Sequence, residues 1–275
     1  MDLILAVKAI ILGIVEGLTE FLPISSTGHL ILAGDLLNYT GETSKVFSIV
    51  IQTGAIFAIC WEYRVKIGSV IRGLFKWEAA AVKFTLNLAI AFMPLAILGL
   101  LFGSLIKAYL FKPIPVATAF IVGAFIIFWA EKREHTVRIH EVEDLSWSDA
   151  LKLGFAQALA LIPGTSRSGS TIIGGLFFGL SRKAATEFSF FLAIPTLIIA
   201  SLYDLYKHHD LLNSDDLPIF GVGILAAFFS ALLAVRGLLR YISHHDFTVF
   251  AWYRIVFGLL VIGTAYSGLV EWTVD

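Results

Sequence analysis

The sequence predicts an all-α polytopic membrane protein that is built from two related halves. Of its 275 residues, 58% are hydrophobic and only 15% are charged, a charged fraction well below the roughly 25% of soluble globular domains. Apolar runs of about 20 residues, the length that crosses roughly 30 Å of hydrocarbon, recur along the whole chain. Two further apolar stretches are interrupted by Pro, Gly and Ser. We therefore expect six transmembrane helices plus two re-entrant helix–loop–helix hairpins.

The six spans are apolar runs that charged or turn-forming residues flank on both sides. In chain order they cover residues 46–61, 84–103, 114–130, 185–203, 217–239 and 247–269.

The charges between the spans predict the orientation of the chain. Lys and Arg are concentrated in 62–83 and 131–152. The fifth span is followed by Arg236 and Arg240, whereas the connection 204–216 is rich in Asp. Because basic connections tend to stay in the cytoplasm, both termini are expected to face outward.

The stretches 3–37 and 149–180 do not fit simple spans, because each is broken in the middle and each half is too short to cross. Irregular backbone at membrane depth is tolerated only where protein buries it or where it lines a wet cavity. We interpret each stretch as a re-entrant hairpin, and we expect the two loops to meet near the midplane.

A sequence repeat relates the two halves. Residues 23–28 (Pro-Ile-Ser-Ser-Thr-Gly) align with 163–168 (Pro-Gly-Thr-Ser-Arg-Ser) at one offset, and Phe47-Ser48 matches Phe188-Ser189 at nearly that offset. Three spans and one hairpin per half make an odd number of crossings, so the repeats are expected to have inverted topology, as in many transporters. Within one integrated membrane domain, the first repeat covers residues 1–140 and the second covers 141–275.

Glu16 and Glu20 lie four residues apart in a predicted helix, so their carboxylates share one face of an otherwise apolar segment. Two acids there are costly unless a cation, a shared proton or a water-filled pocket compensates them. Ionisable residues inside a membrane are functional by default. The alternative is a pair that is merely exposed near the membrane surface.

Hydroxyl groups cluster directly after Pro23, where the second half of the first hairpin is expected to begin. Ser26 and His29 are three residues apart and share a helical face, which puts a candidate base beside a hydroxyl. A satisfied core histidine is the alternative for His29. Ser25 and Thr27 are either substrate ligands or helix caps.

The second loop, residues 163–171, has the composition of an anion site. It offers hydroxyls, glycines, the N-terminus of a following helix and Arg167. Free N–H groups at a helix N-terminus bind phosphate, and a guanidinium can clamp two phosphate oxygens. A structural ion pair of Arg167 with Glu16 or Glu20 is the alternative. The expected diphosphate-binding residues are Ser25, Thr27, Gly164, Thr165, Ser166, Ser168 and Gly169.

Together the two loops suit a metal-bound phosphoanhydride. Glu16 and Glu20 would bind Mg²⁺ or Ca²⁺ together with the phosphate oxygens. Arg167 would take the charge that develops on the phosphoryl group, and Ser26 or a water would attack. No Walker pattern is present in the sequence. The net charge of −1 argues against a nucleic-acid partner.

The run from Glu16 to His29, Glu-Gly-Leu-Thr-Glu-Phe-Leu-Pro-Ile-Ser-Ser-Thr-Gly-His, closely resembles a motif of the undecaprenyl-diphosphate phosphatases of the bacitracin-resistance type. Residues 163–169, Pro-Gly-Thr-Ser-Arg-Ser-Gly, resemble their second motif. The resemblance covers essentially the whole chain, without a departure at the motif positions. It implies removal of one phosphate from undecaprenyl diphosphate, which recycles the peptidoglycan carrier lipid at the outer face of the bacterial plasma (inner) membrane. It also implies roles for Glu16, Glu20, Ser26, His29 and Arg167.

The main alternative function is a carrier or flippase of an anionic lipid or solute, because inverted repeats and broken helices are common in transporters. Ser26 with His29 and the Glu16/Glu20 pair favour the enzyme, since simple anion binding does not call for carboxylates beside the phosphate. A structural scaffold would explain none of the intramembrane charges. The type-2 acid phosphatases fit less well, since Ile173 stands where their histidine would be expected.

Two pairs of glycines have the small-xxx-small spacing of closely packed membrane helices. These are Gly99 with Gly103 and Gly175 with Gly179. The spacing usually means packing within one bundle, and it also allows a homodimer.

Overall fold

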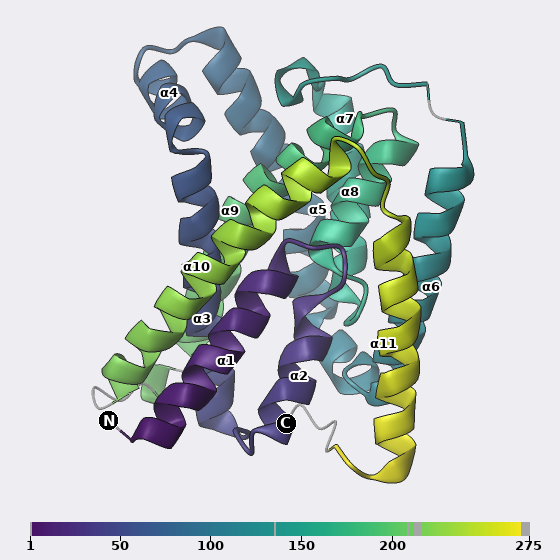
Figure 1. The fold of residues 1–275 in the computed structure, drawn as a ribbon. Coiled ribbons are helices and arrows are strands. Elements are labelled where there is room, and N and C mark those ends of the chain that lie inside the picture. Colours follow the sequence, from purple (N-terminus) through teal and green to yellow (C-terminus); the bar gives the residue numbers. More distant parts are fainter. Residues whose placement is uncertain (1, 135, 208, 212–215, 271–275) are drawn as a thin grey trace.

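The computed structural model describes residues 2–134, 136–207, 209–211 and 216–270, and it is all-helical apart from one isolated bridge between Ile139 and Leu180. Six helices are long and apolar enough to cross a membrane, which confirms the number of spans that the sequence predicts. They are α3 (Glu42–Glu62), α5 (Ala79–Leu110), α6 (Pro113–Lys132), α9 (Arg182–Lys207), α10 (Leu217–Ile242) and α11 (Thr248–Ser267). Figure 1 shows the start of α1 and the end of α11 at the same end of the bundle.

Each of the two interrupted stretches forms a helix, a break and a second, shorter helix. The first consists of α1 (Leu3–Glu20) and α2 (Ser26–Leu36), and the second of α7 (Trp147–Ala158), the short turn η2 (Leu159–Leu161) and α8 (Arg167–Phe177). The breaks fall at the Pro-Gly-Ser-rich segments. In Figure 1 both breaks lie well inside the bundle rather than at its ends.

The backbone leaves the helical conformation at equivalent places in the two breaks. Ser25 has φ 67° and Ser166 has φ 75°, a left-handed conformation that non-glycine residues seldom adopt. Each residue immediately precedes a helix of 11 residues. The strained residue thus re-aims the chain just before Ser26 and Arg167, and both of these side chains contact Glu20 at the end of α1.

One basic connection contains a helix of its own. Within the segment 62–83 lies the amphipathic helix α4 (Arg64–Phe75). Apolar residues recur along it at helical spacing, between its charged residues. The other short turns are η1 (Val142–Asp144) and η3 (His209–Leu211).

The helices pack in a pattern in which the two halves exchange partners. In the first half, α1 and α3 both pack against α10 of the second half, and α10 is the most extensive contact of α1. In the second half, α7 and α9 both pack against α5 of the first half, and α5 is the most extensive contact of α7. Close approach depends on glycine in both cases. A Cβ atom on Gly13 would lie 2.5 Å from the carbonyl oxygen of Gly223, and one on Gly154 would lie 2.6 Å from that of Ala91. These two contacts bring the backbones together where larger side chains would force the helices apart.

The α7 helix is fixed at its start by a buried carboxylate. Asp149 is 4% exposed and accepts hydrogen bonds from Arg138 and from both the backbone N–H and the hydroxyl of Ser146. Burial raises the pKa of Asp149, but the hydrogen bonds from Arg138 and Ser146 outweigh it and lower the pKa from 3.8 to about 2. Because the folded-state pKa is the lower one, this contribution is present above about pH 4 and is lost as the pH falls toward 2.

We therefore expect Asp149→Asn to destabilise the detergent-solubilised protein at pH 7 by about 1–2 kcal/mol, the free energy that this pKa difference represents after allowance for the half-exposed Arg138. Thermal unfolding measured between pH 7 and pH 2 checks it. The stability difference between wild type and variant is expected to shrink below pH 4, and a difference independent of pH would contradict the assignment.

Candidate active site

Glu20, Ser26 and Arg167 form one hydrogen-bonded group where the two breaks meet. Ser26 Oγ donates to Glu20 Oε2 at 2.6 Å. Arg167 donates from both Nε and Nη2 to Glu20 Oε1 at 3.3 Å, and its Nη1 donates to the carbonyl of Ser189 at 3.1 Å. The side chains of Arg167 and Glu20 are only 9% and 6% exposed. An acid from the first half thus joins a hydroxyl to an arginine from the second half, 147 residues away.

Glu16 lies one turn before Glu20 on α1 and is almost completely buried, at 1% exposure. It interacts electrostatically with both Glu20 and Arg167. Within the described part of the chain its Oε1 atom has no hydrogen-bond partner. A buried carboxylate oxygen without a partner is costly, so this atom is a natural contact for a bound cation.

His29 points away from Ser26. Its Nδ1 lies 2.7 Å from the carbonyl oxygen of Ser25, and its Nε2 lies 2.7 Å from the hydroxyl of Tyr253. Since a carbonyl only accepts, the proton is assigned to Nδ1, and Nε2 accepts from Tyr253. The ring stacks on Phe257 at a centroid distance of 3.9 Å. The partner of the Ser26 hydroxyl is therefore Glu20 and not the neighbouring histidine that helical spacing suggested.

The hydroxyls of the second break are used mainly in holding the loop. Ser166 Oγ accepts from the N–H of Gly169 at 3.1 Å and so caps α8. Ser168 Oγ donates to the carbonyl of Leu22, which ties the second loop to the first. By contrast, the buried Ser25 side chain makes no capping hydrogen bond at the start of α2 in the described part of the chain. Thr27 is partly buried at the start of α2.

Arg254 is the site residue that the sequence analysis missed. It lies within α11, is 1% exposed, and pairs with no carboxylate in the described chain. Each of its five N–H groups instead finds a backbone carbonyl at 2.9–3.2 Å. The acceptors are Pro23 of the first break, Gly164 and Thr165 of the second, and Ala119 and Phe120 of α6.

One guanidinium therefore clamps both breaks to a third element. Gly123 makes room for it, because a Cβ atom there would lie 2.2 Å from Arg254 Nη2. Arg254 could have been identified from the sequence, because it is a charged residue inside the last apolar run. Arginines within membrane spans are rare and usually have a functional or structural role.

Fold and site together define a polytopic helical membrane protein with a buried carboxylate–hydroxyl–guanidinium group, a set of side chains suited to phosphate chemistry. The family model described as "Bacitracin resistance protein BacA" matches residues 9–260. The chain belongs to this family.

Curated relatives align along their whole length. The undecaprenyl-diphosphatase of Dechloromonas aromatica (strain RCB) is 68% identical over 275 residues, which is 100% of both chains. That of Nitrosospira multiformis is 66% identical over 99% of this chain and 100% of its own. That of Nitrosomonas europaea is 63% identical over 100% of both.

Proposed function

We infer that this protein is an undecaprenyl-diphosphatase, which hydrolyses undecaprenyl diphosphate to undecaprenyl phosphate and inorganic phosphate. The identity of more than 60% to full-length relatives with that name supports the assignment. The observation in the structure that carries it is the hydrogen bond between Ser26 and Glu20 beside Arg167. A carrier that only bound an anion would gain nothing from a carboxylate next to the phosphate.

In the mechanism that we propose, Glu20 is the general base. It accepts the proton of the nucleophile, which is either the Ser26 hydroxyl or a water that this hydroxyl positions. The nucleophile bonds to the terminal phosphorus, and the bond from that phosphorus to the bridging oxygen breaks, so undecaprenyl phosphate leaves. If Ser26 attacks, a water then cleaves the phosphoserine. Arg167 stabilises the negative charge on the transferred phosphoryl group once that group replaces Glu20 as its partner.

Glu16 and Glu20 fit a hard divalent cation such as Mg²⁺ or Ca²⁺, because carboxylate oxygens are the ligands these ions take. No group of three or more His, Cys, Asp or Glu that could hold a metal occurs among the described residues. A two-carboxylate site still suits Mg²⁺, which keeps several waters and also binds substrate phosphates. When bound, the metal would neutralise charge on the diphosphate oxygens, and the unpartnered Oε1 of Glu16 supports its presence.

Metal dependence has a direct test. We expect phosphate release from undecaprenyl diphosphate by purified protein to stop in excess chelator and to return when Mg²⁺ or Ca²⁺ is added. Glu16→Gln is expected to raise the metal concentration for half-maximal activity by about tenfold or more, since it removes one of two ligands. Full activity in chelator would rule out the metal while leaving the phosphatase assignment intact.

We also propose that both interrupted stretches are re-entrant and that the two halves form an inverted repeat. The exchange of packing partners between the halves supports this, as does the correspondence of α2 and α8 at a spacing of 141 residues. Positive φ angles occur before both helices, at Ser25 and Ser166, and after both, at Asn38 and Gly179. This spacing is one residue larger than the offset that aligns residues 23–28 with 163–168, and it equals the offset between Phe47 and Phe188. In this register the counterpart of Ser26 is Arg167, so the two halves contribute different chemistry from one position.

The site is proposed to open to the outer side of the bacterial plasma (inner) membrane, with both termini outside, in line with the basic connections on the opposite side. A homodimer stays a proposal: Gly175 packs against Ala185 of its own chain, whereas Gly103 on α5 faces open space.

A further inference from the structure

A basic cavity of about 360 Å³ lies at the opposite end of α8 from Arg167. At a rise of about 1.5 Å per residue, the length of this helix separates the cavity from the active site by roughly 15 Å. Three cationic side chains line it, from the end of α6, from the connection that follows and from α7. They are Arg133, Arg138 and Lys152.

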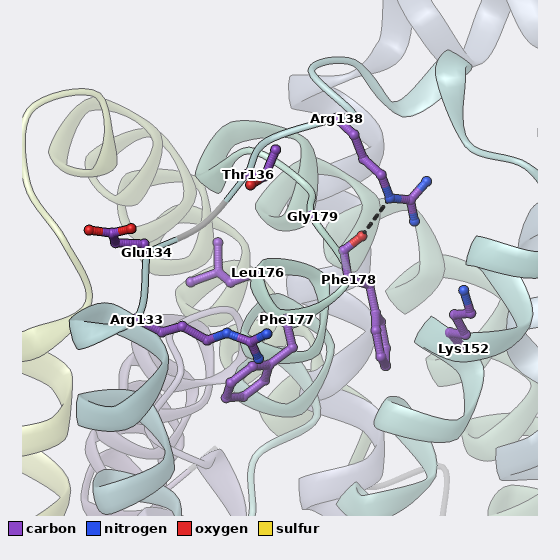
Figure 2. Close-up of a pocket in the computed structure, with 9 residues that line it drawn as sticks. All are labelled: Arg133, Glu134, Thr136, Arg138, Lys152, Leu176, Phe177, Phe178 and Gly179. Atoms are coloured by element: carbon purple, nitrogen blue, oxygen red, sulfur yellow. Dashed lines mark hydrogen bonds between the residues drawn. The ribbon is translucent and has the colours of Figure 1, made fainter.

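Two of the three cations are free to bind a ligand. Arg138 is engaged with Asp149 and donates from Nε to the carbonyl of Phe178 at 3.1 Å, as Figure 2 shows. The side chains of Arg133 and Lys152 make no hydrogen bond or ion pair with any described residue, although the backbone N–H of Arg133 donates to the carbonyls of Trp129 and Ala130. Figure 2 shows Arg133 extending toward Phe177 and Lys152 on the opposite side of the cavity, while the carboxylate of Glu134 points away from them. The cavity therefore presents uncompensated positive charge.

Apolar residues at the end of α8 line one side of the cavity, here called its apolar floor. Leu176, Phe177 and Phe178 line it, and Phe177 contacts Trp129 at a ring distance of 4.8 Å. Trp129 is 62% exposed, and Trp147 at the start of α7 is 66% exposed. Exposed tryptophans near helix ends mark the headgroup level of a bilayer.

We propose that this cavity binds the phosphodiester headgroup of an anionic phospholipid from the inner leaflet. Arg133 and Lys152 take the phosphate oxygens, and the apolar floor with Trp129 lies under the first part of the acyl chains. Basic cavities between helices on the cytoplasmic side bind anionic headgroups in this way. The cavity lies at the end of the bundle opposite the start of α1 and the end of α11 (Figure 1), the end that carries the basic connections. The proposal does not depend on the catalytic mechanism.

Native mass spectrometry of the full chain in detergent, titrated with phosphatidylglycerol or with phosphatidylcholine, tests the proposal. The double variant Arg133→Gln/Lys152→Gln removes the two free cations. Lys107→Gln/Lys112→Gln is the matched control, because it removes two exposed cations near the other end of α6, one from the last turn of α5 and one from the N-cap of α6. Neither pair touches the active site.

We expect wild type to bind phosphatidylglycerol with at least about tenfold preference over phosphatidylcholine. The cavity variant is expected to lose most of that preference and the control variant to keep it. An equal loss in both variants would show only a general effect of charge and would overturn the proposal. Displacement of the lipid by millimolar inorganic phosphate would also overturn it, because it would assign the cavity to free phosphate.

Discussion

Glu20→Gln is expected to lower the rate of phosphate release from undecaprenyl diphosphate by about a thousandfold, with little change in fold. The substitution keeps the size of the side chain but removes the carboxylate to which the Ser26 hydroxyl donates a hydrogen bond, at 2.6 Å. A positioned general base contributes roughly a hundredfold to ten-thousandfold to a rate, and Glu20 is also a proposed metal ligand. Single-turnover phosphate release at saturating lipid and metal measures the loss in the chemical step.

Glu141→Gln is the matched control, because it neutralises an exposed glutamate that pairs with Lys183 outside the site. It should leave the rate unchanged. Size-exclusion profiles and thermal unfolding would confirm that both variants are folded. A folded Glu20→Gln variant that retained more than about a tenth of the wild-type rate would exclude Glu20 as the base.

Ser26→Ala separates the two nucleophiles that the geometry allows. If the serine attacks, radiolabelled substrate should leave a phosphorylated protein intermediate in wild type and none in the variant. If a water attacks, wild type should show no such intermediate, and the variant should keep a residual rate.

The breaks in the two helical stretches could be predicted from sequence because their cause is local. Pro23 stands beside several Ser and Gly residues, and a cluster of this kind favours the end of a helix. An isolated proline does not have this effect here, since Pro94 and Pro195 lie inside α5 and α9. The meeting of Arg167 with the acidic pair was also within reach, since an unpaired charge in apolar surroundings needs an opposite charge. The sequence analysis offered an ion pair between Arg167 and Glu16 or Glu20 as the alternative to anion binding. The structure shows the ion pair with Glu20, within the candidate active site.

The partner of Ser26 could not be predicted from spacing alone. Helical periodicity places Ser26 and His29 on one face, but Ser26 is the first residue of α2 and follows Ser25 with its positive φ. That backbone conformation turns the hydroxyl back toward α1 and Glu20. Tyr253, whose hydroxyl is hydrogen-bonded to Nε2 of His29, is 224 residues away in sequence. No local pattern relates positions so far apart.

Arg254→Lys is expected to unfold or strongly destabilise the protein while keeping the charge. Lysine has three N–H donors where arginine has five, so at least two backbone carbonyls in the breaks and α6 lose their partners. A hydrogen bond to a charged group contributes about 1.5–3 kcal/mol, which gives a loss of about 3 kcal/mol or more. Arg240→Lys is the control on an exposed side chain, and thermal unfolding in detergent compares the two.

The position of the lost bonds makes the prediction more specific than a loss of stability. Three of the five carbonyls belong to Pro23, Gly164 and Thr165, so the two breaks should separate before the spans do. Hydrogen exchange in the Arg254→Lys protein should rise first around residues 21–27 and 162–169. Exchange that rose equally along α6 and α11 would mean that Arg254 stabilises the bundle as a whole. An increase in exchange confined to the breaks would instead show that one guanidinium holds the proposed catalytic groups of the two halves together.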